Sequence, residues 1–203
     1  MRTSLAAVPV HGQARARRDA DNRRARQWRT IRLWGAVLGV ALAVVLFVVW
    51  QTGAYLPQLG RDLPNEGGVG VHLQQGAVLT QRVVPPASGP HYASRAPYGV
   101  STAAVAPGNW LHALEHGGVV VLYRCGGIDE CTALGTRFEG EVFTPARLGS
   151  FGERKLVITP YVGLATPFAA LSWARVLELE TLDPAAILAF YDRYLDRGPE
   201  RAA

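Results

Sequence analysis

The sequence predicts one membrane-spanning helix followed by a small α+β domain with a mainly antiparallel sheet. Three observations lead to this prediction. An uncharged apolar stretch covers residues 33–50, directly after an Arg-rich segment. Short apolar runs rich in β-branched residues recur within residues 119–173, as expected for buried strands. Near the end of the chain, Asp183 and Pro184 precede an apolar stripe with helical spacing.

Residues 33–50 read LWGAVLGVALAVVLFVVW and contain no charge. As a helix this stretch spans about 27 Å, close to the roughly 30 Å hydrocarbon core of a bilayer. Trp34 and Trp50 lie at its two ends, where indole rings favour the headgroup level. A cleaved signal peptide is the alternative, with Thr52 and Ala54 as a loose pair of small residues. Since the apolar stretch is longer than that of a usual signal sequence, we expect a retained span.

The segment before the span contains nine Arg and two acidic residues. Positively charged flanks stay on the cytoplasmic side, so the amino terminus is expected in the cytoplasm and the chain after the span outside it. The expected organisation has four parts: a cytoplasmic Arg-rich arm at 1–32, a transmembrane helix at 33–50, a Pro- and Gly-rich linker at 51–68, and an extracytoplasmic domain at 69–200.

The basic arm accounts for the net charge of +5 and the pI near 9.6. After the arm, twelve Lys and Arg stand against fourteen Asp and Glu. This slightly acidic remainder excludes a broad nucleic-acid-binding surface. We therefore expect the lipid bilayer, and other envelope proteins, as partners and no nucleic acid, while the sequence does not indicate an oligomeric state.

The outer domain is expected to combine several strands with short helices. A long irregular segment with five prolines, residues 85–109, interrupts this pattern. Val, Leu and Ile runs predict the strands, and Asp183 caps the last helix with Pro184 in its first turn. The predicted strands are Ala77 to Val84, Val119 to Cys125, Lys155 to Tyr161 and Phe168 to Trp173, and the predicted helices are Glu130 to Glu139 and the segment after Asp183.

Two cysteines, Cys125 and Cys131, lie in the part of the chain expected outside the cytoplasm. Thiols in such compartments tend to be oxidised, which favours a disulfide between them. Closing so short a loop stabilises a fold by about 2 kcal/mol. A thiolate pair for metal binding or redox exchange is the alternative, although the spacing is not the C-x-x-C of thioredoxin-like sites.

Histidines gather in the domain, three of them within 26 residues. A short helix capped by Asn109 and ended by two glycines puts His112 and His116 four residues apart on one face, which is the spacing of metal ligands. With His91 they form a candidate metal site, and His72 or Glu115 is a further ligand or supporting partner. A pair of buried, structural histidines is the alternative.

The segment from His112 to His116 also matches the H-x-x-E-H pattern of inverted zinc proteases, with Glu115 as the base. The match is incomplete, because such enzymes need a long helix at this place, whereas two glycines and a predicted strand directly follow His116. Met1 is the only methionine, which excludes thioether-rich copper sites and leaves zinc or copper(II). Three hypotheses remain: an extracytoplasmic metal-binding domain, a non-catalytic envelope interaction or scaffold module with structural histidines, and a metal-dependent hydrolase. No reaction is indicated.

Five segments follow one another in the domain: PPASGPHY at 85–92, YGV at 98–100, HALEHGGVV at 112–120, AALSW at 169–173 and RGPE at 197–200. Together and in this order they resemble an uncharacterised bacterial family, the domain of unknown function 3105. The likeness covers about residues 66–200. It implies a single-span membrane protein with an outer domain, and it implies no activity or cofactor. The chain has Ser172 where members often carry Thr, and Pro97 where some carry Cys.

Overall fold

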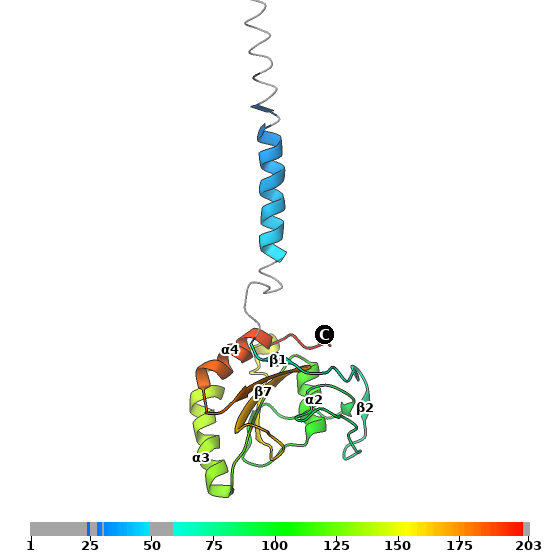
Figure 1. The fold of residues 1–203 in the computed structure, drawn as a ribbon, viewed down its shortest axis with the longest axis vertical. Coiled ribbons are helices and arrows are strands. Elements are labelled where there is room, and N and C mark those ends of the chain that lie inside the picture. The colour runs from blue at the N-terminus through cyan, green and yellow to red at the C-terminus, as the bar shows by residue number, and fades with distance from the viewer. Residues whose placement is uncertain (1–23, 25–27, 30, 49–58, 201–203) are drawn as a thin grey trace, which may run out of the picture. The chain divides into compact units, whose positions relative to one another are not determined.

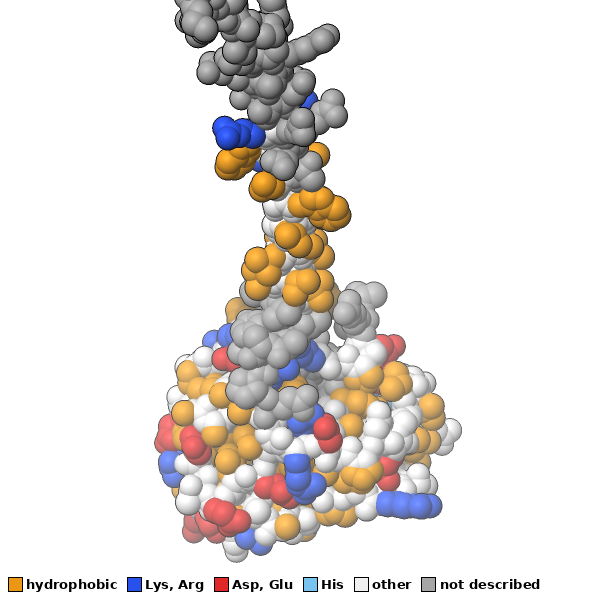
Figure 2. All heavy atoms as spheres, turned by 45° about the horizontal axis from the view of Figure 1, so that its top comes forward, with side chains coloured by type: hydrophobic (Ala, Val, Ile, Leu, Met, Phe, Trp, Pro, Cys, Tyr) orange, Lys and Arg blue, Asp and Glu red, His pale blue; other side chains and the backbone are white. Residues whose placement is uncertain are grey.

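The computed structural model describes residues 24, 28–29, 31–48 and 59–200, which belong to two compact units, Met1–Pro57 and Gln58–Ala203. In the first unit, one helix covers Ile31–Val48 with a mean hydropathy of 2.4. Its apolar side chains are exposed around the helix (Figure 2). By length and composition this helix can cross a membrane. Most of the Arg-rich arm, the last two residues of the expected span and residues 51–58 lie outside the described residues.

The second unit is built on a six-stranded sheet with the strand order β1-β8-β7-β5-β6-β4. The pairs β1/β8, β8/β7 and β7/β5 are antiparallel, whereas β5/β6 and β6/β4 are parallel. The prediction of an α+β domain with a mainly antiparallel sheet is confirmed. The strands are β1 (Arg61–Asp62), β4 (Gly99–Val100), β5 (Val119–Tyr123), β6 (Leu156–Pro160), β7 (Phe168–Ser172) and β8 (Arg175–Leu179).

Helices cover both faces of this sheet (Figure 1). Because alternate residues of a strand point to opposite faces, Val120 and Leu122 of β5 pack with α2 (Pro107–Glu115), while Val119 and Val121 pack on the other side. That second face is covered by α3 (Ile128–Phe138) and α4 (Pro184–Tyr194). Three layers thus enclose two apolar cores, and α2, which carries His112, lies on the first face.

A second, two-stranded sheet lies beside α2. It consists of β2 (His72–Leu73) and β3 (His91–Tyr92), paired in parallel. Residues 77–84 form no strand, so the prediction of a strand there is wrong. No strand pairs with this run, and none of its residues is buried; Gln81 instead donates a side-chain hydrogen bond to the Pro90 carbonyl at 2.6 Å.

The other predicted elements occur where the sequence places them, within two or three residues at their ends. Asp183 caps α4, since its side chain accepts a hydrogen bond from the Ala186 N–H at 3.0 Å. A π-helix, Glu139–Phe143, continues α3, and a 3-10 turn, Ser150–Gly152, precedes β6. Cys125, just after β5, is joined in a disulfide to Cys131 of α3.

Candidate metal centre

Helix α2 begins earlier than predicted. Pro107 occupies the first turn and Ala106 has an extended backbone, so Asn109 is not the N-cap. Proline is favoured at this position because the first N–H groups of a helix have no partner within the helix. The Asn109 side chain instead donates to the Ser94 carbonyl at 2.6 Å and to the Gln75 side chain at 3.2 Å. Asn109 thereby ties the loop after β2 to the helix.

The carboxyl end of α2 is fixed by the two predicted glycines. The Gly117 N–H donates to the Leu114 carbonyl at 3.1 Å, and the Gly118 N–H donates to the Ala113 carbonyl at 2.8 Å. This pairing satisfies the last carbonyls of the helix and needs a left-handed residue, which Gly117 supplies with φ +76°. The helix therefore stops within one turn of His112, and the backbone stays helical long enough for His112 and His116 to meet.

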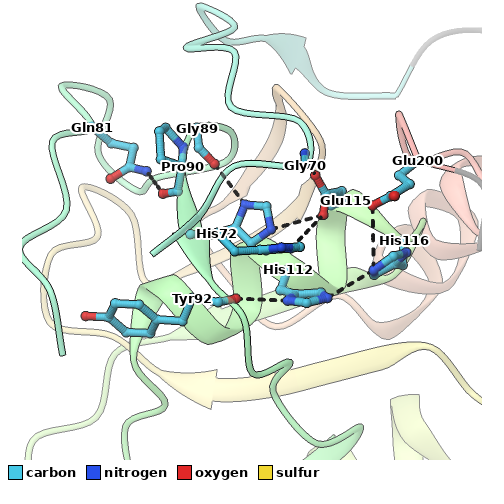
Figure 3. Close-up of polar contacts among 11 residues, drawn as sticks. Gly70, His72, Gln81, Gly89, Pro90, Tyr92, His112, Glu115, His116 and Glu200 are labelled. Carbon is cyan, nitrogen blue, oxygen red and sulfur yellow. Dashed lines mark hydrogen bonds and ion pairs between the residues drawn. The ribbon is translucent and has the colours of Figure 1, made fainter. Parts of the chain in front are cut away.

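Three separate segments bring four imidazoles together (Figure 3). The parallel pairing of β2 and β3 sets His72 beside His91, with ring centroids 5.1 Å apart. The α2 residue His112 stacks on His72 at 4.9 Å and meets the ring of His91 at 5.1 Å. Its Nε2 atom lies 3.0 Å from the Nε2 atom of His116. All four predicted histidines are thus neighbours.

Two of the rings are oriented by backbone carbonyls. The Nδ1 atom of His91 lies 3.0 Å from the Gly89 carbonyl oxygen, and the Nδ1 atom of His112 lies 2.9 Å from the Tyr92 carbonyl oxygen. A carbonyl oxygen only accepts, so each Nδ1 carries the proton and donates it. In the neutral rings both Nε2 atoms then hold a lone pair. This is the usual arrangement of a metal-binding histidine, whose other nitrogen donates to a carbonyl or carboxylate.

Glu115 is fully buried beside these lone pairs. Its Oε1 atom accepts a hydrogen bond from the Gly70 N–H at 2.6 Å, and its Oε2 atom lies 3.0 Å from His91 Nε2 and 3.8 Å from His72 Nε2. Burial alone would raise the pKa of Glu115, but the Gly70 hydrogen bond, together with the positive charge that His91 carries when its Nε2 is also protonated, outweighs it and holds the pKa below its ordinary value. The Glu115 side chain is therefore a carboxylate anion next to the imidazole rings of His91 and His72.

The segment after α4 closes the site on the His116 side. Glu200 donates its backbone N–H to the Glu115 carbonyl at 3.2 Å, and its carboxylate lies 3.9 Å from His116 Nε2. Gly198 is pressed so closely against the last turn of α2 that a Cβ atom there would lie 2.0 Å from the Glu115 carbonyl oxygen. The Nδ1 atom of His116 is buried without a hydrogen-bond partner in the part of the chain that the structure describes.

The donor set fits a transition-metal ion. Two overlapping groups, His72 with His91 and His112, and His112 with Glu115 and His116, each have their ligand atoms within 4.8 Å of one another. Tetrahedral ligands at about 2.1 Å from zinc lie about 3.4 Å apart, so small side-chain movements suffice. Burial lowers the pKa of His112, which keeps its ring neutral and able to bind a cation. His72 is the most open member, with 40% of its side chain exposed.

A hollow of about 210 Å³ opens beside His116, between Arg95, Tyr98 and Lys155. The charges around it are balanced, because Arg95 lies 3.8 Å from Glu153 and Lys155 lies 2.7 Å from Asp196. Because the hollow lies directly beside His116, ligands can approach that side of the cluster from solvent. Glu115, the base expected of a hydrolase, is fully buried, and both of its carboxylate oxygens are engaged.

The sequence of the domain matches the model of a known protein family. The model of the family described as protein of unknown function (DUF3105) matches residues 72–203. The chain belongs to this family. The DUF3105 match starts at His72 and includes every residue of the histidine cluster. No curated protein and no solved structure matches the chain.

Sequence reasoning missed the groups that orient the cluster. The Gly70 N–H, the carbonyls of Gly89 and Tyr92, and the Glu200 side chain all lie far from α2 along the chain. Three of these residues fall in the segments that resemble DUF3105, which is the one signal that could have singled them out. Spacing alone could not, because backbone groups have no side-chain signature.

Proposed function

We propose that this DUF3105 member is a single-span membrane protein whose extracytoplasmic domain binds one transition-metal ion, zinc or copper(II). His91, His112 and His116 supply the ligands, while His72 and Glu115 complete the site or support it. The amino terminus lies in the cytoplasm. The Arg-rich arm before the apolar helix and the disulfide in the domain support this orientation, because basic flanks stay inside and disulfides persist outside.

One observation carries the metal proposal. His91 and His112 each donate the Nδ1 proton to a backbone carbonyl, and their Nε2 lone pairs face other candidate ligands at 3.0 Å. Without a cation or an added proton, a lone pair beside a carboxylate oxygen is repulsive, and burial strengthens that repulsion. A metal ion bound between these atoms converts the repulsion into coordination.

The choice of metal follows from the ligand atoms. Imidazole nitrogens and a carboxylate suit zinc and copper(II), and both cysteines are consumed by the disulfide. When bound, such an ion acts as a Lewis acid or, in the case of copper, as a one-electron carrier. The chain's own contribution is to hold the rings in one tautomer and to bury the carboxylate beside them.

The test is elemental analysis of the full chain, purified in a nonionic detergent and dialysed without chelator. The parent protein is compared with a variant that combines His91→Ala, His112→Ala and His116→Ala. His11→Ala serves as the matched control, since that histidine precedes the domain. We expect near-stoichiometric zinc or copper in the parent and the control, and none in the triple variant.

Thermal unfolding with and without added metal shows whether a variant lacks metal because it has not folded. A bound ion stabilises the native state by mass action, so the parent should unfold at a higher temperature with metal than with chelator. His72→Ala removes only the exposed ring and should lower the affinity without abolishing folding. Absence of metal from the parent, or equal metal in the triple variant, would overturn the proposal and leave the histidines as structural members of an interaction module.

A further inference from the structure

A second hollow, outside the histidine cluster, lies where β1, the turn from β7 to β8 and the end of α4 meet. Its volume is about 500 Å³, within the range of small-molecule sites. Of its charged lining residues, three are arginines and one is an acid. The lining residues are Asp62, Leu63, Asn65, Ser172, Trp173, Ala174, Arg175, Arg193, Tyr194 and Arg197.

The unsatisfied polar atoms of this lining are all N–H donors. Trp173 Nε1 and two guanidinium nitrogens of Arg193, Nε and Nη1, are buried with no hydrogen-bond partner among the described residues. These three atoms are half of the six buried side-chain nitrogen and oxygen atoms without a partner in that part of the chain. Leaving a buried donor unpaired costs about 1–3 kcal/mol, and more for a charged group. Because all three unpaired donors lie in one hollow, we expect a ligand that accepts hydrogen bonds there.

Charge points the same way. Asp62 is already engaged by an ion pair with Arg175. The lining holds three arginines and one acid, so Arg193, with its unpaired nitrogens, lies in a hollow that is cationic by composition. Guanidinium groups bind phosphate oxygens with directed, charge-assisted hydrogen bonds. The three unpaired donors come from α4 and from the β7–β8 turn, so they suit a ligand with acceptors in several directions.

We infer that this hollow, which we call the arginine pocket, binds the phosphate group of a phosphate ester. A tetrahedral phosphate presents three or four oxygens and matches the three unpaired donors of Trp173 and Arg193, whereas a planar carboxylate presents two. The arginine pocket contains none of the candidate metal ligands. Trp173 links the two sites, because its ring centroid lies 6.3 Å from the ring centroid of His91. Trp173 thus contacts the candidate metal centre and lines the pocket.

Two sources can supply this chemistry, a soluble phosphate ester or a lipid headgroup. Asp62 follows the last described residue of the apolar helix, Val48, by 14 residues. A connection of that length extends at most about 50 Å, which allows contact with headgroups when the helix is anchored as proposed but fixes no position for the pocket. The test therefore has one arm for each source.

The full chain in a nonionic detergent is titrated, at constant ionic strength and with chelator present, with inorganic phosphate, glycerol 1-phosphate and a short-chain phosphatidylglycerol. Binding is measured by calorimetry. Saturable binding of any of the three supports the pocket, and comparison of the three affinities identifies the source. Binding of none of them overturns the inference and assigns the unpaired donors to water.

Arg193→Gln is the diagnostic variant, and Arg137→Gln is its charge-matched control. Arg137 is an exposed α3 residue paired with Glu141, so it removes the same charge far from the pocket. We expect Arg193→Gln to weaken phosphate binding at least about tenfold, as the loss of a charge-assisted hydrogen bond implies, and Arg137→Gln to leave it unchanged. Equal losses in both variants would reduce the effect to net charge and overturn the inference.

Trp173→Phe provides a second, milder variant, because it keeps an aromatic ring and removes only the Nε1 donor. Its unfolding temperature checks the fold, and a several-fold weaker affinity in a folded variant supports the inference. Unchanged affinity in folded Trp173→Phe and folded Arg193→Gln would overturn it.

Discussion

The Nε2 atom of His91 lies 3.0 Å from the Oε2 atom of Glu115, and both side chains are fully buried. The other nitrogen of the same ring donates to the Gly89 carbonyl. A buried acid and a buried base in direct contact form either an ion pair or two ligands of one cation. Substitutions that keep the shape and change only the charge separate these roles.

Glu115→Gln should keep the metal-free domain folded and weaken metal binding. The Gln amide can accept from the Gly70 N–H and donate to His91 Nε2, so both buried partners stay satisfied. Without the negative charge, metal affinity should fall roughly 10–100-fold. Competition with a chelator of known affinity measures the change, and Glu180→Gln, an exposed carboxylate of the domain, is the control. Wild-type affinity in Glu115→Gln would remove the carboxylate from the metal centre.

Removal of the disulfide should cost stability and spare the metal. Replacing Cys125 and Cys131 by Ser opens a short loop, and the free energy of unfolding should fall by about 2 kcal/mol. Because no sulfur is among the candidate ligands, metal content per chain should stay as in the parent. Denaturant unfolding and elemental analysis of the same preparation check both statements. Metal loss from a folded double variant would show that the ligand set is wrong.

Gly198→Ala should loosen the carboxyl-terminal segment from α2. A Cβ atom at this position would lie 2.0 Å from the Glu115 carbonyl oxygen and 2.3 Å from the Gly117 nitrogen, which are backbone atoms that cannot turn away. The free energy of unfolding should fall by about 1–3 kcal/mol.

Gly140→Ala is the matched control for Gly198→Ala, since nothing lies within 4 Å of a Cβ atom there. It should leave the free energy of unfolding unchanged or raise it. Thermal unfolding of the two variants side by side makes the comparison, and equal stability would mean that residues 198–200 do not pack against α2 in solution.

Asp196 should stabilise the domain at neutral pH and not in acid. Its carboxylate accepts from the Ser150 backbone N–H and hydroxyl at 2.8 Å and lies 2.7 Å from Lys155 Nζ. Burial alone would raise the pKa of Asp196, but these partners outweigh it and lower the pKa from its ordinary 3.8. The stabilisation is therefore complete above about pH 4 and disappears as the pH falls through the lower, folded-state pKa.

Asp196→Asn tests this pH dependence. Because the carboxylate is about one-third exposed, solvent screening limits the loss at pH 7 to about 1 kcal/mol. The difference from the parent should shrink as the pH falls below 4, where the parent carboxylate takes up its proton. Urea unfolding at a series of pH values measures both proteins. A difference that stays constant into acid would assign the effect to packing instead of charge.

The sequence by itself determined the elements whose signals are local. Asp183 and Pro184 define the start of α4, the apolar run at 119–123 defines a central strand, and the glycines after His116 define the end of α2. Each of these signals depends on a residue's own backbone preference or on a period of two or four residues. Local composition likewise predicted the apolar helix and identified the four histidines as candidate ligands.

Only the tertiary structure decided which of these residues meet. The pairing of His72 with His91 depends on a parallel contact across 18 intervening residues, and the ring orientations depend on carbonyls with no side-chain pattern. The apolar run at 77–84 has the composition of a strand and remains unpaired. A strand needs a partner and a ligand set needs convergence, and both are long-range relationships that local preferences do not encode.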